Sequence, residues 1–310
     1  MSAFWSIFNL SLLAATIRTA TPLIYGGIGG VFSERSGIMN LGIEGTMLIG
    51  ACAAAIISLE TNSAWLGVLG GMGFGVLIGL LHAFMCIRFK ANQTVIGTGI
   101  NIFATGITPM VLQAYSGNPG SSPSVPGIAS LSIPVLKDIP VLGPILGQQN
   151  PLTYLALFLV PVSSFLLFQT RLGLRIRAVG EHPRAADTAG IPVFPLQYLS
   201  VGICGALAGI GGAYLSLCQV SIFVKGMTAG RGFMAMAAMI FGKWTPWGAF
   251  GASLLFAFAD ALQISVQAAG LNLPADLLMC APYVLTIFAL AMFVGKAVAP
   301  AQVGKPYIKY

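Results

Sequence analysis

Nine apolar runs of roughly membrane-spanning length constrain the fold of this chain more than any other feature of its sequence. A helix needs about 20 apolar residues to cross the hydrocarbon core of a bilayer. The runs cover residues 4–32, 41–59, 64–87, 93–115, 151–169, 195–218, 232–246, 247–268 and 275–295. The seventh run is short, and Arg18 and Pro22 interrupt the first. We predict an all-α bundle of about eight to ten transmembrane helices that forms a single domain over residues 1–310.

The composition supports a membrane environment. Charged residues make up 7% of the 310 residues and hydrophobic residues 56%, whereas soluble domains are about one quarter charged. So few charges cannot cover a surface that faces water, so lipid must be the main solvent. The net charge of +7 is typical of basic cytoplasmic loops in a membrane protein and does not indicate nucleic-acid binding.

Basic residues predict the orientation in the membrane. If the C-terminus is cytoplasmic, eleven Lys and Arg residues fall on the inner side, namely Arg35, Arg88, Lys90, Arg171, Arg175, Arg177, Arg184, Lys243, Lys296, Lys305 and Lys309. Only Lys137, Lys225 and Arg231 fall on the outer side. Because basic residues favour the cytoplasmic side, we expect a multi-pass protein of a bacterial inner membrane with segment 170–194 inside and loop 116–150 outside.

Two segments allow more than one interpretation. The outer loop 116–150 is rich in Gly, Pro and Ser, which fits either a linker or a docking face for an extracytoplasmic partner. "SGIMNLGIEGTMLIGA" opens the second run and "GMTAGRGFMAMAAMIFG" opens the seventh. Both are Gly-rich and then apolar, and in the predicted topology they run in opposite directions. This is the pattern of inverted repeats whose broken helices face a central pathway.

The sequence contains no motif of an enzyme active site. It has no GxxxxGK[ST] loop for phosphate, no HExxH and no GxSxG. Two histidines and five cysteines without CxxC spacing do not form a convincing metal site. We expect a non-enzymatic chain that binds neither a cofactor nor a metal.

Polar residues inside the apolar runs are candidates for a solute pathway. Charged groups at membrane depth cost about 2.5–3.5 kcal/mol by insertion scales, so they are retained for a reason. The candidates are Asn40, Glu44 and Asp260. They either line a polar pathway or hydrogen-bond neighbouring helices; for Asn101 in the fourth run, packing is the better explanation.

The segment "TRLGLRIRAVGEHPRAADTAGIPVFP" (170–195) gathers an unusual share of the charge of the chain. It is too polar to insert, and "RAADTAG" within it predicts a short helix that begins near Pro183 and stops at Gly190. A positive-inside loop explains the arginines alone. A small face at Ala185 and Ala186 with a charged rim fits docking into a groove of another protein.

Three motifs resemble permease subunits of bacterial ABC importers, in the branch for nucleosides and simple sugars that is related to the branched-chain amino acid permeases. They are "ERSGIMNLGIEG", "GLRIRAVGEHPRAADTAGI" and "GFMAMAAMIFGKWTPWGA". In that family a cytoplasmic coupling helix, with a pattern similar to EAA, three residues and Gly, sits in a cleft of an ATPase subunit. Ala185, Ala186 and Gly190 match that pattern, but Arg184 stands where Glu is expected.

The resemblance implies the rest of the transporter. It implies two ATPase subunits that bind ATP and Mg²⁺, a second permease subunit (identical or not) and an extracytoplasmic solute-binding protein. The residues implied for ATPase coupling are Arg175, Arg177, Glu181, His182, Pro183, Ala185, Ala186 and Gly190. The alternative is an ion-coupled secondary transporter that uses Glu44 or Asp260 and needs no ATPase.

Overall fold

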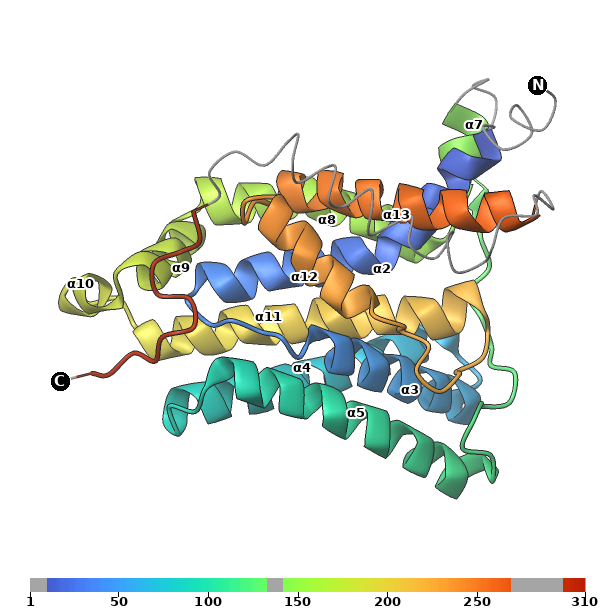
Figure 1. The fold of residues 1–310 in the computed structure, drawn as a ribbon, viewed down its shortest axis with the longest axis horizontal. Helices are drawn as coiled ribbons and strands as arrows, with labels where there is room; N and C mark the ends of the chain where they lie inside the picture. Colours follow the sequence, from blue (N-terminus) through green and yellow to red (C-terminus); the bar gives the residue numbers. More distant parts are fainter. Residues whose placement is uncertain (1–9, 133–141, 269–297, 310) are drawn as a thin grey trace.

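The computed structural model describes residues 10–132, 142–268 and 298–309. These residues form a bundle of helices, with α9, α10 and the C-terminal segment at one end and α7 at the other (Figure 1). The long helices are α2 (Leu10–Arg35), α3 (Ile43–Thr61), α4 (Ala64–Arg88), α5 (Gln93–Ser116), α8 (Pro151–Gln169), α11 (Val193–Tyr214) and α13 (Pro246–Ala268). The shorter elements are α7 (Leu142–Leu146), α9 (Arg171–Glu181), α10 (Pro183–Thr188), the π-helix η1 (Leu215–Gln219) and α12 (Arg231–Phe241).

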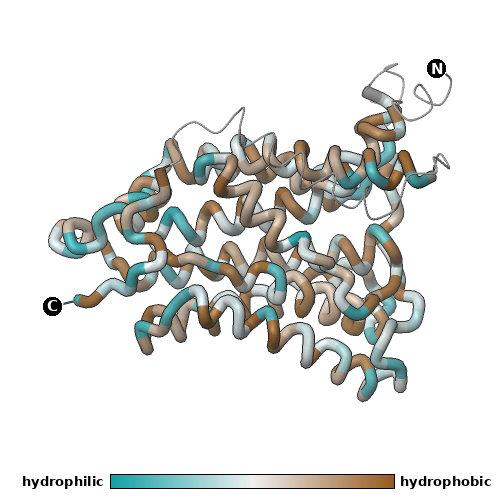
Figure 2. The backbone as a smooth tube through the Cα atoms, viewed as in Figure 1, coloured by the Kyte–Doolittle hydropathy of each residue, from teal (hydrophilic) through white to brown (hydrophobic). Residues whose placement is uncertain are grey.

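The described residues confirm the predicted all-α class. Two-residue strands, β1 (Leu131–Ser132) and β2 (Gln148–Gln149), form their only named sheet, which is antiparallel. Six described helices are long and apolar enough to cross a membrane. Hydrophobic residues run along the helices, and hydrophilic residues are frequent at α10 and in the loops at the opposite end (Figure 2).

The ends of four predicted runs lie within one residue of the ends of α4, α5, α8 and α13. The first run differs from the expectation, because α2 extends to Arg35 and every residue from Thr19 to Glu34 is buried. It is a central helix surrounded by protein rather than a lipid-facing span. The seventh run yields only the 11-residue helix α12. The predicted run 275–295 lies outside the described residues.

Glycines let the central helices approach closely. A Cβ on Gly209 of α11 would clash with the backbone of Gly71 on α4, and one on Gly205 would clash with Gly75. Such small-residue contacts drive helix packing in lipid, where burying apolar surface gives no gain between helices. The outer helices instead expose large apolar side chains, among them Ile102 and Met110 on α5 and Phe158 on α8. These surfaces fit contact with lipid or with another membrane subunit.

The two motifs that predicted inverted repeats meet in the middle of the bundle. The first turn of α3 contacts the first turn of α12 through hydrogen bonds from Gly230 and Gly232 to Glu44. From this point α12 runs toward the α9 end and α3 runs toward the opposite end (Figure 1). The 11-residue α12 and the 19-residue α3 thus meet at their N-termini. The inverted repeat itself stays a prediction.

Candidate functional site

The predicted coupling segment forms two helices at one end of the bundle, where the sequence predicted one short helix (Figure 1). Thr170 caps α9 by accepting a hydrogen bond from the backbone N–H of Gly173 at 3.2 Å. Pro183 occupies the first turn of α10, where its missing N–H is not needed. Gly190 follows with φ of +77°, a conformation that glycine adopts without strain. The predicted start and stop signals of the short helix are therefore confirmed.

Two of the predicted coupling residues, Arg175 and Arg177, lie on α9 and not on α10. Arg177 is half-buried, and its guanidinium lies 4.9 Å from the ring centroid of Phe168 at the end of α8. Arg35 at the end of α2 lies over the same ring at 5.6 Å. Arg175 is exposed. Arg177 thus ties α9 to the bundle, and Arg175 remains available for a partner.

The two alanines of the predicted small face of α10 differ in exposure, since Ala185 is exposed and Ala186 is buried. Pro183 and Ala186 are buried against this chain, and Ala186 is only 4% exposed. The exposed residues are Arg184, Ala185 and Thr188 of α10, followed by Ala189 at its C-cap. Ala186 packs on the bundle of its own chain, and its predicted role in ATPase docking stays a prediction.

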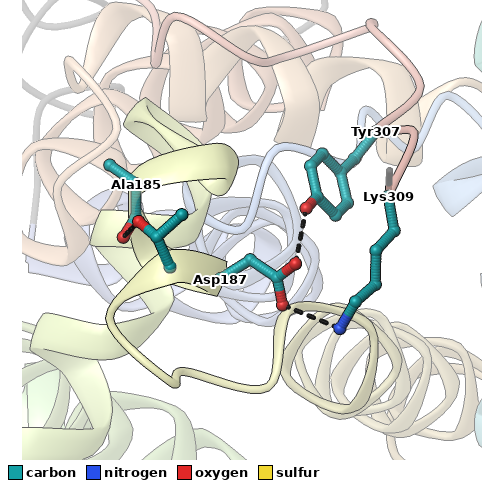
Figure 3. Close-up of polar contacts among 5 residues, drawn as sticks. Ala185, Asp187, Tyr307 and Lys309 are labelled. Carbon is teal, nitrogen blue, oxygen red and sulfur yellow. Dashed lines mark hydrogen bonds and ion pairs between the residues drawn. The ribbon is translucent and has the colours of Figure 1, made fainter.

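The C-terminal segment 298–309 holds α10 in place through polar contacts. Asp187 accepts a hydrogen bond from the Tyr307 hydroxyl and forms an ion pair with Lys309 Nζ, both at 3.0 Å (Figure 3). These two donors lower the pKa of Asp187, the Lys309 ammonium contributing most. The backbone N–H of Ala301 donates to Glu181 Oε2 at 3.2 Å, and that of Gln302 donates to the Gly180 carbonyl at 3.0 Å.

Between α10 and the C-terminal segment lies a groove of about 400 Å³. The predicted residues Glu181, His182, Pro183 and Ala185 line it, together with Arg184. From the C-terminal segment it is lined by Gln302, Pro306, Tyr307 and Ile308. The structure therefore brings half of the predicted coupling residues to one exposed groove.

Glu44 and Asn40 are engaged by their own chain. Glu44 Oε1 accepts from the N–H of Gly230 at 2.9 Å, and Oε2 accepts from that of Gly232 at 2.6 Å. Glu44 thereby satisfies the start of α12, where backbone N–H groups and the helix dipole favour an anion. Asn40 is 2% exposed, and its Oδ1 accepts from the Gly42 N–H at 3.0 Å.

Two further polar residues of the membrane region differ in their surroundings. Asp260 is partly buried on α13. Asn101 accepts from the Gly45 N–H and donates to the Leu41 carbonyl. The packing role expected for Asn101 is confirmed. No group of three or more His, Cys, Asp or Glu residues within the described ranges could hold a metal ion.

The turn between α12 and α13 holds contacts that the sequence reasoning did not assign. Trp244 Nε1 donates to buried Glu34 Oε2 at 2.5 Å, and Arg35 Nε donates to the Trp244 carbonyl at 2.9 Å. Lys243 and Trp244 both have positive φ, at 54° and 52°, which is uncommon for side chains of this size. The motifs "ERSG" and "GKWTPWG" were visible in the sequence, but nothing in them indicated that they touch.

Comparison with known proteins identifies the family. Residues 12–295 match the family described as "Branched-chain amino acid transport system / permease component". The chain belongs to this family. Three relatives that are 39–43% identical to it are named as ABC transporter permease proteins. This confirms the predicted resemblance and supports it over the ion-coupled alternative. Together with the six apolar helices, the match makes the chain a multi-pass membrane protein.

Individual relatives show how far the similarity extends. The chain is 43% identical to the guanosine ABC transporter permease protein NupQ of Bacillus subtilis (strain 168), over 96% of each chain. It is 39% identical to TsgC13 of Haloferax volcanii, named provisionally as a glucose ABC transporter permease protein, over 86% of this chain and 80% of the relative. A second guanosine permease protein of Bacillus subtilis, NupP, is 28% identical over 82% of this chain and 74% of its own.

Proposed function

We propose that this chain is a permease subunit of an ABC importer that carries a nucleoside or a simple sugar across a bacterial inner membrane. The observation that carries the proposal is α10, a short helix that stands at one end of a lipid-embedded bundle with Arg184 and Ala185 exposed. The names of NupQ, NupP and TsgC13 support this class of solute. A nucleoside and a sugar share a polyhydroxylated ring, which a pathway with few fixed charges can accept.

The chain supplies the pathway and a partner supplies the energy. ATP and Mg²⁺ bind to two ATPase subunits, and α10 with its groove docks into a cleft of one of them. A second permease subunit completes the pathway, and an extracytoplasmic protein delivers the solute. Bacillus subtilis has two related guanosine permease proteins of unequal similarity to this chain, which supports a non-identical second subunit.

Movement of α10 reaches the bundle through contiguous contacts. Gly180 at the end of α9 packs directly on the backbone of Arg35, so that a Cβ there would clash. Arg35 in turn contacts the turn after α12 through Trp244. ATP favours one of two packed arrangements of the subunits because it binds the closed ATPase pair better, and the bundle follows by a shift in population.

The docking claim is tested by adding a bulky charge to the exposed face of α10. Ala185→Arg should reduce co-purification of the ATPase subunit about tenfold or more, because a desolvated, unpaired charge in a cleft costs several kcal/mol. Gln169→Arg, an exposed position at the same end of the bundle, is the matched control and should retain the ATPase. Normal ATPase binding and solute uptake by Ala185→Arg would contradict the proposal.

A further inference from the structure

A pocket of about 330 Å³ lies where two of the candidate membrane spans end. It stands beside the last turn of α4 and the first two turns of α11, and residues of the C-terminal segment complete it. These three parts lie at the α10 end of the bundle (Figure 1). Because α4 and α11 are both long and apolar enough to cross a membrane, their ends place the pocket at the boundary between hydrocarbon and water.

Cations and aromatic rings make up most of the lining of this pocket. They are Arg88, Lys90 and Lys309, together with Phe194, Tyr198 and Tyr307. All three cations are exposed. Cations that line one pocket repel one another, and among the described residues only Lys309 has a carboxylate partner, Asp187. An anion in the pocket would relieve this repulsion.

The fold brings the three cations together from distant parts of the sequence. Arg88 and Lys90 lie at the end of α4, whereas Lys309 belongs to the C-terminal segment. A lysine ammonium group has three N–H donors, and the contact of Lys309 with Asp187 at 3.0 Å leaves donors of this group for a ligand. A general excess of basic residues on the cytoplasmic side does not require that they share one concave surface.

Exposed apolar side chains beside these cations indicate lipid as the source of the anion. Phe89 stands between Arg88 and Lys90 in the sequence and is 63% exposed. Its ring packs edge-on against the exposed ring of Phe84, with 5.4 Å between the centroids. The exposed apolar surface continues along α4 through Leu77, Leu80 and Leu81. A soluble anion or an acidic protein surface would leave these side chains uncovered, whereas the acyl chains of a lipid would cover them.

The two tyrosines of the pocket also fit the membrane boundary. Tyrosine is enriched there because its ring is apolar and its hydroxyl is polar. Tyr198 packs on a buried cluster that includes Ala83 of α4 and Val201 of α11. The ring of Tyr307 packs on Phe194, with 5.7 Å between the centroids. Contacts within the chain therefore hold the aromatic wall of the pocket in place.

We propose that this pocket binds the phosphate group of an anionic phospholipid, whose acyl chains lie on the exposed apolar surface of α4. Arg88 and Lys90 donate to the phosphate oxygens, since guanidinium and ammonium groups in basic pockets between membrane helices bind lipid headgroups. Lys309 shares its donors between the phosphate and Asp187. Because Asp187 lies on α10, the bound lipid adjoins the contact that holds α10 in place. The inference depends neither on the transported solute nor on the ATPase subunit.

Lipid binding is measured on the purified full-length chain in mild detergent by native mass spectrometry. The probe is phosphatidylglycerol, and phosphatidylcholine and glycerol 3-phosphate are the comparisons. The parent should bind phosphatidylglycerol about tenfold or more tightly than phosphatidylcholine, because only the former carries net negative charge. In the double variant with Arg88→Gln and Lys90→Gln, the Kd for phosphatidylglycerol should rise about thirtyfold, from the usual contribution of two basic residues at an anionic lipid surface.

The matched control is the double variant with Arg171→Gln and Lys243→Gln. Both residues are exposed and lie outside the pocket lining, and Lys243 shares with Lys90 a positive φ, 54° against 53°. The two double variants therefore lose the same charge, and the control should keep the parent Kd. An equal loss of binding in both would show a general attraction to a basic surface and would overturn the site. Competition by glycerol 3-phosphate as effective as that by the lipid would overturn the lipid as the ligand.

A second measurement leaves the pocket residues intact. Benzoylphenylalanine in place of Leu80 puts a photoreactive group on α4, about 10 Å along the helix from Ile87 of the pocket. In nanodiscs with equal amounts of the two phospholipids, this group should crosslink phosphatidylglycerol in clear excess. The same group in place of Phe158, which is 64% exposed on α8, should crosslink both lipids equally. Equal crosslinking at Leu80, or crosslinking there to a protein subunit of the complete transporter, would contradict the proposal.

Discussion

Two carboxylates in different parts of the molecule each hold a junction between distant segments. Glu44 lies at membrane depth, is 9% exposed, and accepts from two backbone N–H groups of the α12 start. Asp187 lies on α10, and it accepts from a hydroxyl and an ammonium group of the C-terminal segment. The number of hydrogen bonds is the same, but the solvent around them is not.

The difference decides what each junction can do. In lipid an unpaired backbone N–H finds no water, so the bonds of Glu44 are costly to break. Lys309 is 60% exposed, and surface ion pairs of this kind contribute little because water and salt compete for both partners. The Glu44 junction is therefore a fixed contact between the start of α3 and the start of α12. The Asp187 junction is one that a partner protein could open.

The largest expected effect is that of Glu44→Ala. This change leaves the N–H groups of Gly230 and Gly232 unpaired, and each buried unpaired donor costs about 1–3 kcal/mol. The free energy of unfolding of the detergent-solubilised protein should fall by about 2–6 kcal/mol. Denaturant titration followed by circular dichroism measures it. Glu44→Gln keeps one acceptor, so its free energy of unfolding should fall by roughly half as much. An unchanged free energy of unfolding in Glu44→Ala would mean that these hydrogen bonds do not stabilise the fold.

The two carboxylates also show what could be predicted from the sequence. Hydrophobic run length was enough to place α4, α5, α8 and α13 within one residue, because lipid thickness fixes the length of a spanning helix. Pro183 and Gly190 predicted the two ends of α10 because each restricts or permits the backbone conformation at its own position. Glu44 was singled out by its cost at membrane depth, but its partners are 186 and 188 residues away. Nothing local indicated a structural role.

Features that depend on contacts between distant segments escaped the sequence reasoning. Which alanine of α10 faces outward depends on how the helix lies on the bundle, so the sequence could not show that Ala186 is buried and Ala185 exposed. A cavity of about 500 Å³ opposite the α10 end is lined by Arg18, Asn150 and Gln219, which come from α2, the N-cap of α8 and η1 and are distant in the sequence. The sequence drew attention to Arg18 only because it interrupts the first apolar run.

The next largest effect should distinguish two neighbouring alanines of α10. Ala186→Arg forces a charged side chain into a position that is 4% exposed, so α10 should detach from the bundle. Amide hydrogen exchange in residues 183–190 should then rise at least tenfold, because burying an unpaired charge costs several kcal/mol. In Ala185→Arg the added side chain points outward, and exchange should match that of the parent. Equal exchange in both variants would contradict the assignment of the two faces.

A smaller effect is expected at the Asp187 junction. Asp187→Asn removes the ion pair with Lys309, and hydrogen exchange in residues 298–309 should increase while global stability stays unchanged. The pH dependence has a definite sign. Because the pKa of Asp187 in the folded protein lies below its ordinary value of 3.8, the contribution of the ion pair is present above that value and is lost as the pH falls through the lower one. The parent should therefore resemble Asp187→Asn only in strong acid, and a difference that disappears between pH 6 and 5 would exclude Asp187 as its cause.

The smallest effect should come from Tyr307→Phe, which removes only the hydroxyl bond to Asp187. The ring remains packed on Phe194, with 5.7 Å between the centroids, and Lys309 still pairs with the carboxylate. Hydrogen exchange in residues 298–309 should rise less than in Asp187→Asn, because one of the two contacts survives. If Tyr307→Phe released the segment as fully as Asp187→Asn, the hydroxyl bond would be the main attachment. The Asp187 junction would then be closer to the Glu44 junction than we propose. Its stability would depend on one hydrogen bond and not on the exposed ion pair.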